Sequence, residues 1–125
     1  MSVPDVPPSA VGAVRAVFAA CLAQDRPAME RLLAADSVFT SPRDDHLDKD
    51  AFLARCFPTA GRFCSYGLLD VVPVGDGAAA SGEVFVRYAY ELVGGGHFRN
   101  VEVLTVRDGL VAEAQVYFGG AFPPG

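Results

Sequence analysis

The side chains best suited to chemistry are a carboxylate, Glu102, and three polar neighbours that strand periodicity places beside it. Successive side chains of a strand point to opposite faces of a sheet, so in the segment 97–107 Asn100 and Glu102 share a face with three apolar residues. A three-residue turn of glycines before this segment adds Tyr88 and Tyr90 to the same face. This turn sets Tyr88 opposite Glu102 and the next tyrosine opposite Asn100. We therefore expect four polar groups to converge on a mostly apolar surface.

The register of this hairpin decides which side chains meet. A two-residue turn would put Arg87 opposite Glu102, because a shift by one residue exchanges the two faces of a strand. We favour the three-residue turn because it keeps Arg87 and Glu91 off the face that the helices cover.

A buried Glu102 predicts either a binding site or an internal structural contact. A carboxylate out of water is costly unless it finds partners or takes up a proton. An apolar pocket with a few converging polar groups is typical of a small-molecule site. In such a site Glu102 would be the acid or base, and the tyrosines and Asn100 would orient a carbonyl group or stabilise an enolate. The alternatives are that a tyrosine bonds Glu102 for stability alone, or that Glu102 lies in water at an edge.

A second polar cluster contains Asp44, Asp45 and His46. Histidine ordinarily titrates near neutral pH, so His46 could carry a proton while Asp44 or Asp45 orients its ring. We take His46 and Asp45 as candidate catalytic residues beside Glu102. The alternative is a solvated turn that leads into a helix capped by Asp48.

Neither a metal nor a cofactor is expected. The acidic loop matches no recognised spacing of metal ligands, and Cys21, Cys56 and Cys64 are an odd number without metal-type spacing. Free thiols in a reduced, cytoplasmic protein are the simplest interpretation. A cysteine nucleophile is a weaker one, because a buried cysteine usually packs as a small hydrophobic residue. His97, beside the glycine turn, is expected to be exposed.

The spacing of apolar residues, caps and turn signals predicts an α+β domain. Ser9, Asp25 and Asp48 are expected to cap three helices, and Pro58 to end the third. Turn signals of glycine and aspartate separate the strands that follow. The predicted strands are 37–41, 63–74, 78–93 (bent or bulged near 81–82), 97–107 and 110–119. Residues 1–8 are expected to be a flexible lead and 120–125 a tail, on either side of one domain, 9–119, in which helices cover one face of an antiparallel sheet.

Composition excludes several classes of function. A chain of 125 residues is typical of one domain. Its net charge is −5 and its only lysine is Lys49, while nine arginines are scattered singly, so nucleic-acid binding is not expected. No apolar run is long enough to cross a bilayer, and the first residues do not look like a signal peptide. The scarcity of lysine beside abundant alanine, glycine and arginine suggests a GC-rich bacterial gene.

Three features together resemble the SnoaL-like branch of the nuclear transport factor 2-like superfamily. They are the order of the elements, the segment 38–42, and the closing stretch 101–119. This resemblance covers residues 9–119 and implies a cone of three helices on a curved sheet around a pocket. The branch includes polyketide cyclases, ketosteroid isomerases and limonene epoxide hydrolases, so it is informative about fold and much less so about reaction.

Matching single residues narrows the reaction. Against the ketosteroid isomerase pattern, Glu102 falls where that family keeps the carboxylic acid of its oxyanion hole, a case the field uses as an example of an acid held neutral by an apolar site. Ser41 falls where that family has its aspartate base, and Val17 or Phe18 where it has a tyrosine. Val116 falls where limonene epoxide hydrolases carry a catalytic aspartate. The resemblance therefore argues against both of these reactions.

These observations leave three functions open. The first is cyclisation, isomerisation or hydration of a polyketide-like or terpenoid compound by acid–base chemistry. The second is non-catalytic binding of a small hydrophobic ligand, and the third is a dimeric interaction domain whose cavity is only packing. For the first two, the residues expected to contact the ligand are Phe39, Ser41, Phe52, Cys56, Tyr88, Tyr90, Asn100, Val116 and Phe118.

The outer face of the predicted sheet is expected to bind a second copy of the chain. It carries apolar residues interleaved with Arg87, Arg99 and Gln115, and a monomer rarely leaves such a patch in water. The apolar members are Phe85, Val101, Val103 and Tyr117. Members of the superfamily often dimerise through this face, so the resemblance implies a homodimer with two-fold symmetry.

Overall fold

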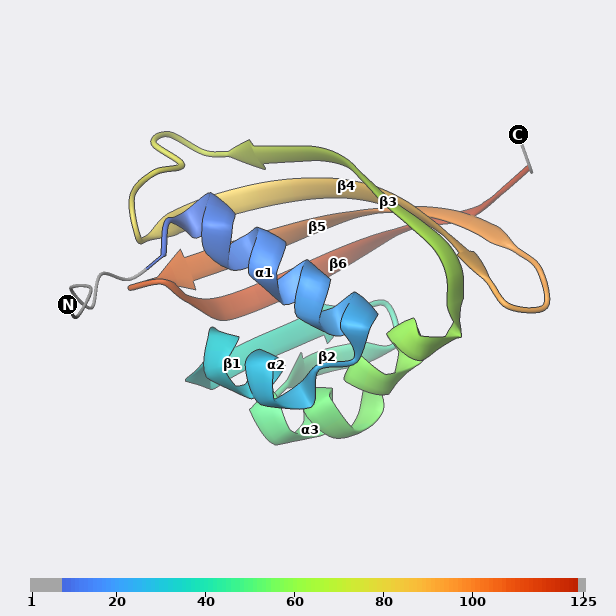
Figure 1. Cartoon of the computed structure of the whole chain (residues 1–125), viewed down its shortest axis with the longest axis horizontal. Helices are drawn as coiled ribbons and strands as arrows, with labels where there is room; N and C mark the ends of the chain where they lie inside the picture. The colour runs from blue at the N-terminus through green and yellow to red at the C-terminus, as the bar shows by residue number, and fades with distance from the viewer. Residues whose placement is uncertain (1–7, 124–125) are drawn as a thin grey trace, which may run out of the picture.

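The computed structural model describes residues 8–123. Along the chain, two α-helices are followed by two strands, then by a third α-helix and a 3₁₀ helix, and then by four more strands of the same sheet (Figure 1). The helices are α1 (Ala10–Ala23), α2 (Arg26–Leu32), α3 (Lys49–Arg55) and the 3₁₀ helix η1 (Phe57–Arg62). The strands are β1 (Leu33–Ser41), β2 (Asp44–Leu47), β3 (Phe63–Pro73), β4 (Gly82–Leu92), β5 (His97–Arg107) and β6 (Leu110–Phe122).

The six strands form one curved, open sheet in the order β2-β1-β6-β5-β4-β3. All neighbours are antiparallel except β1 and β6, which run parallel because the chain crosses over between them. Helix α1 lies across the concave face and contacts β3 to β6, while α2 and α3 pack beside β1 and β2 (Figure 1). The end of the sheet that carries the β4–β5 turn extends beyond α1.

The helices begin where the sequence predicts. The side chains of Ser9, Asp25 and Asp48 accept hydrogen bonds from backbone N–H groups of the first turns of α1, α2 and α3, at 2.9, 3.2 and 2.9 Å. Each cap satisfies a donor that the helix itself leaves unpaired. Buried side chains of α1, among them Val14, then pack with Leu104 of the sheet in one apolar cluster. No helix among residues 8–123 is long and apolar enough to cross a bilayer.

Several predicted boundaries were wrong. Residues 43–46 were expected as a loop, but 44–46 belong to β2, because the chain turns back after β1 and Phe39 pairs with Leu47. Helix α3 ends at Arg55, and Pro58 lies inside η1. The bend expected at 81–82 is the start of β4. Two irregularities lie instead in β3, between Phe63 and Ser65 and between Leu68 and Asp70.

The expected lead and tail fall partly outside the described residues. Strand β6 runs to Phe122, so residues 120–122, predicted as tail, belong to the sheet. Of the expected lead, only Pro8 is described, and residues 124–125 of the tail are not.

The hairpin register was also wrong, although the predicted faces were right. Tyr88 pairs with Asn100 and Val86 with Glu102, where the three-residue turn would have paired Tyr88 with Glu102. The glycine turn is longer than expected, since the last bridge joins Glu91 to His97. The change displaces the partners by two residues, and a shift by an even number keeps every side chain on its face.

A bulge in β6 sets the end of the sheet. Phe98 pairs with Ala121 and Asn100 with Phe118, so Gly119 and Gly120 lie opposite the single residue between them. The bulge reverses the alternation of β6. As a result Phe122 stands on the outer face, where its ring lies 4.3 Å from the Arg99 guanidinium carbon.

Gly119→Ala is expected to destabilise the protein by about 1–3 kcal/mol through overpacking. A Cβ at Gly119 would lie far inside the van der Waals distance of the Arg99 carbonyl oxygen, which is backbone and cannot move alone. Gly67→Ala is the matched control, because a Cβ at Gly67 of β3 meets nothing within 4 Å. Urea denaturation of both variants measures the difference. Equal stability of the two would show that the bulge yields without cost.

Candidate functional site

Glu102 is buried at the centre of the concave face. Its paired neighbours across the strands are Val86 on β4 and Val116 on β6, and the residue is only 9% exposed. The Tyr88 hydroxyl donates a hydrogen bond of 3.2 Å to Oε1. Loss of hydration on burial raises the pKa of Glu102 from 4.5 to about 7, and the hydrogen bond from Tyr88 opposes this only in part. Both protonation states of this carboxyl group are therefore populated near neutral pH.

A chain of hydrogen bonds fixes the position of Tyr88. Asn100 Nδ2 donates to the Tyr88 hydroxyl oxygen at 3.2 Å, and the Gly119 N–H donates to Asn100 Oδ1 at 3.3 Å. The Tyr88 hydroxyl thus accepts one bond and donates another. The chain connects the bulge of β6 to the carboxyl group, so the backbone orients the acid through two side chains.

A small cavity of about 30 Å³ borders Glu102. Its wall is mainly apolar and comes from α1, β1, α3 and the centre of the sheet. The lining residues include Val17, Phe39, Phe52, Glu102, Leu104 and Val111. Asp48 also lines it, but its carboxylate accepts the Ala51 N–H as a helix cap. This volume is sufficient for one or two water molecules and too small for an organic ligand.

Aromatic rings line the concave face from the buried polar groups to the uncovered end of the sheet. Phe63, Tyr66, Tyr88, Tyr90 and Phe98 follow one another with ring centroids 4.5–6.0 Å apart. The row then continues 5.7 Å further to Phe118, which is 49% exposed. We call these six residues the aromatic row. It brings together Tyr88, Tyr90 and Phe118, three of the predicted ligand residues.

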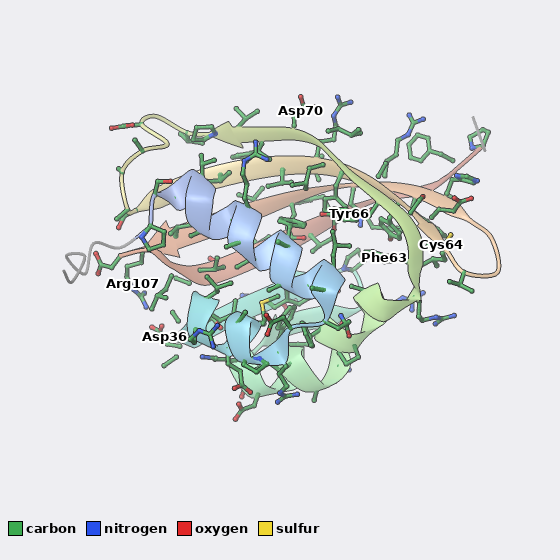
Figure 2. The ribbon with its side chains drawn as sticks, in the orientation of Figure 1. Asp36, Phe63, Cys64, Tyr66, Asp70 and Arg107 are labelled. Atoms are coloured by element: carbon green, nitrogen blue, oxygen red, sulfur yellow. The ribbon has the colours of Figure 1, made fainter. Side chains whose placement is uncertain are left out.

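Tyr66 is the member of the row that sequence reasoning missed. Figure 2 labels it with Phe63 on β3, near the C-terminal end of α1, and its ring lies 6.2 Å from that of Phe18. Its hydroxyl group is buried without a hydrogen-bond partner among the described residues. The alternation of β3 could have placed Tyr66 on the inner face, but the irregularity after Leu68 hides the period of two.

Cys21 adds a thiol from α1 to this region. Burial raises its pKa to about 12, with a smaller contribution from the Glu102 carboxylate. The thiol is therefore protonated at physiological pH and is a poor nucleophile. Cys21 therefore packs as a small apolar residue, whereas Cys64 is exposed.

Ser41 and Cys56, two further predicted ligand residues, meet around Asp44. Asp44 Oδ2 lies 3.4 Å from the Ser41 hydroxyl and 3.6 Å from Cys56 Sγ, and its Oδ1 is 3.1 Å from Arg55. Burial, and then the nearby Asp44, raise the pKa of Cys56 to about 12. Neither residue lines the cavity beside Glu102, so both serve mainly to hold the β1–β2 turn against α3.

His46 and Asp45 lie apart from Glu102. Their side chains are 68% and 87% exposed, and His46 Nδ1 lies 2.5 Å from Asp45 Oδ1. The two residues are on the edge strand β2 and do not line the cavity. No three His, Cys, Asp or Glu side chains within residues 8–123 come together in a way that could hold a metal ion.

A second hollow, of about 280 Å³, lies near the open end of the sheet. Most of its lining side chains, such as Ser65, Ala89 and Arg99, stand on the outer face, opposite to Glu102. Phe122 forms one wall and Gly67 part of the floor. His97 also borders this hollow and pairs with Glu91 at 3.2 Å.

Solved structures with the same fold come from several bacteria. A protein from Kribbella flavida DSM 17836 is 26% identical with a TM-score of 0.75, over 88% of this chain and 86% of that chain. An NTF2-like protein of unknown function from Cytophaga hutchinsonii is 15% identical with a TM-score of 0.73, over 91% and 93%. A candidate polyketide cyclase from Sinorhizobium meliloti is 21% identical with a TM-score of 0.68, over 84% and 93%.

The comparison of sequences assigns the family. No curated protein sequence matches the chain significantly. The family model of the SnoaL-like domain matches residues 14–114, which include most of α1, the other helices, β1 to β5 and Glu102. The fold of the solved relatives agrees with this match. The chain therefore belongs to the SnoaL-like domain family.

Proposed function

We propose that this protein binds a small hydrophobic carbonyl compound on the concave face of its sheet and moves a proton on it with Glu102, without a metal or cofactor. The observation that carries the proposal is the Glu102 carboxyl group, buried between aliphatic residues with Tyr88 as its hydrogen-bond donor and a pKa of about 7. An acid–base group is most effective when its pKa lies near the working pH.

The proposed chemistry needs only one proton carrier. The Glu102 carboxylate takes a proton from the carbon next to a carbonyl group, and the electron pair of the C–H bond moves into an enolate. The protonated Glu102 then returns a proton to the same carbon, which gives exchange with solvent, or to another carbon of an unsaturated ketone, which shifts the double bond and isomerises the compound. In a cyclisation, the enolate carbon attacks a second carbonyl carbon, and Glu102 protonates the oxygen that this attack leaves negative. Tyr88 and Asn100 keep the carboxyl group oriented in either case.

The substrate would be polyketide-like or terpenoid. A mainly apolar wall around one acid is suited to hydrophobic compounds, and the resemblance to polyketide cyclases points the same way. Because the cavity of about 30 Å³ is too small for such a compound, binding has to open the concave face. The aromatic row offers the path, since it leads from Tyr88 to the exposed ring of Phe118.

The experiment is proton–deuterium exchange in D₂O with two enolisable ketones, 2-acetonaphthone and the terpenoid β-ionone. We expect the wild-type protein to accelerate exchange next to the carbonyl group of one or both, with a rate that rises through about pH 7 as Glu102 loses its proton. Proton NMR follows the loss of signal. Binding without exchange would mean a non-catalytic ligand-binding protein. The proposal would be refuted if both ketones failed to bind and neither showed accelerated exchange.

Two copies of the chain would associate through the outer face of the sheet. Phe85 pairs with Val103, and Val101 with Tyr117, so these four side chains lie together on the outer face across β4, β5 and β6. Val103 is already buried between its neighbours, so the other three supply the exposed apolar surface. Phe85 is 42% and Tyr117 58% exposed. Burial of this apolar surface against its two-fold copy would remove it from water.

Tyr117→Arg is expected to convert the dimer into a monomer, because it places two charges in the centre of the proposed contact. Light scattering after gel filtration measures the mass against the 13.2 kDa of one chain. Leu22→Arg is the control, since Leu22 is 40% exposed on α1, away from the patch. A dimer with a micromolar Kd would be mostly formed at a protein concentration of about 100 µM. A wild-type protein that is still monomeric at this concentration would contradict the proposed contact.

A further inference from the structure

The Tyr66 hydroxyl is a buried donor that the protein itself does not use. Its oxygen is inaccessible to solvent and has no hydrogen-bond partner among residues 8–123. Buried polar groups are almost always paired, so an unpaired one requires a reason. The ring itself packs well, against Phe18, Phe63 and Tyr88 at 5.7–6.2 Å between centroids.

The neighbouring Tyr88 provides a comparison, because its hydroxyl has a structural role. Its hydroxyl donates to Glu102 and accepts from Asn100, so its hydrogen-bonding capacity is used within the protein. The rings of Tyr66 and Tyr88 are neighbours, with centroids 5.7 Å apart. Of these two tyrosines, only Tyr66 therefore has a hydroxyl proton that is free for another molecule.

The surroundings of Tyr66 favour a neutral hydroxyl close to the proton carrier. The Tyr66 ring lies 5.7 Å from the ring of Tyr88, whose hydroxyl binds Glu102. Burial raises the pKa of Tyr66 well above its usual value, and the Glu102 carboxylate raises it further. Cys21 contributes in the same direction. The groups facing Tyr66 from α1, namely Phe18 and the protonated Cys21, carry no positive charge. The hydroxyl consequently remains a donor throughout the physiological pH range.

We propose that Tyr66 donates a hydrogen bond to the carbonyl oxygen of the ligand, whose flat, unsaturated body packs against the aromatic row. This inference rests on the proposed function and adds two things to it: the residue that binds the oxygen, and an aromatic or conjugated ketone or aldehyde as the ligand class. The two roles in the reaction then belong to residues of different strands, β3 and β5. Tyr66 holds the oxygen, and Glu102 exchanges a proton with the neighbouring carbon.

The hydrogen bond would also stabilise the enolate. Negative charge grows on the carbonyl oxygen as Glu102 removes the proton, and a donor fixed in an apolar site is most effective on such a charge. Phe63 stacks on Tyr66 and Tyr90, and Tyr90 on Phe98, with planes 10–22° from parallel. These stacked rings offer their apolar edges to a flat ligand, and edge-to-face contacts between aromatic groups are favourable. A saturated, bulky ligand would fit this surface less well.

The test compares Tyr66→Phe with Tyr88→Phe, which removes a hydroxyl that is used within the protein. The probes are 2-acetonaphthone, labelled with ¹³C at the carbonyl carbon, and 2-isopropenylnaphthalene, a hydrocarbon of the same shape. Tyr66→Phe is expected to weaken binding of the ketone by roughly 2- to 10-fold and to leave binding of the hydrocarbon unchanged. The carbonyl resonance of the bound ketone is expected to move upfield in this variant, because the hydrogen bond is lost.

Thermal unfolding without ligand gives a readout that separates binding from structure. Tyr66→Phe is expected to unfold at the wild-type temperature or above it, since the change removes an unpaired buried group. Tyr88→Phe is expected to unfold at a lower temperature, since it leaves Asn100 and Glu102 without their partner. A loss of stability in Tyr66→Phe as large as that in Tyr88→Phe would overturn the inference and make Tyr66 a structural residue.

The remaining outcomes separate the inference from the proposed function. An unchanged carbonyl resonance in Tyr66→Phe, together with exchange by the wild-type protein, overturns the role of Tyr66 and leaves proton transfer by Glu102 intact. Exchange of β-ionone without binding of 2-acetonaphthone overturns the ligand class alone. Binding of the aromatic ketone that depends on Tyr66, without any exchange, supports the inference and overturns catalysis.

Discussion

Glu102→Gln is expected to lose the acceleration of ketone exchange, a decrease of about 10²- to 10⁴-fold if exchange depends on this acid–base group. Glutamine has nearly the same shape, and its Oε1 can still accept the hydrogen bond from Tyr88. It cannot take up or release a proton in this pH range. Ketone binding should therefore change little while the exchange rate falls to that of buffer.

The control for this result is Glu113→Gln, the same change on the neighbouring strand β6. Glu113 is half-buried opposite Thr105 and accepts a hydrogen bond from Gln115 at 3.3 Å, away from the cavity. Exchange rates of the wild type and both variants, measured from pH 5 to 9, complete the experiment. If Glu102→Gln retained the rate and its pH dependence, the proton carrier would be a different group and the proposed function would have to be rebuilt.

The second large effect is a pH dependence of stability that comes from Glu102, which the wild-type protein has and Glu102→Gln lacks. The pKa of Glu102 is about 7 in the folded protein and 4.5 in the reference state. The folded state thus holds a proton that the unfolded state releases between these values, and wild-type stability falls as pH rises from 4.5 to 7. At about 1.4 kcal/mol for each pH unit, the loss is about 3 kcal/mol, and stability due to this group is fully present below pH 4.5.

Denaturation by urea at a series of pH values measures this loss. The unfolding free energy of Glu102→Gln minus that of the wild type should rise from pH 4.5 to 7 and then stay constant. Other titrating groups cancel in the difference, because both proteins contain them. Parallel curves would show that Glu102 has an ordinary pKa and is solvated, which would remove the basis of the site.

Some of the site could be predicted because it depends on local patterns. The alternation of β5 places Asn100 and Glu102 on one face whatever their partners are, and the same holds for Tyr88 and Tyr90 on β4. The structure agrees with this division into faces. The predicted faces are right although the predicted register is wrong, because the register differs by an even number of residues.

Other parts depend on contacts between distant segments. The acidic residues of 44–46 were predicted to share a loop and a function, but strand pairing separates them: Asp44 turns to Arg55, while His46 remains in solvent with Asp45. Tyr66 was missed because its importance comes from Phe18 above it and Tyr88 beside it, and neither is near it in the sequence.

The sequence by itself determined the fold class, the helix caps at Ser9, Asp25 and Asp48, and the inward direction of Glu102, because these follow from periodicity, capping and turn chemistry over short stretches of chain. The tertiary structure alone decided the partners of Glu102, the small size of its cavity and the unpaired Tyr66 hydroxyl. These properties arise where α1 closes on a curved sheet, and both the curvature and the closure depend on bulges and registers that a residue pattern leaves undetermined.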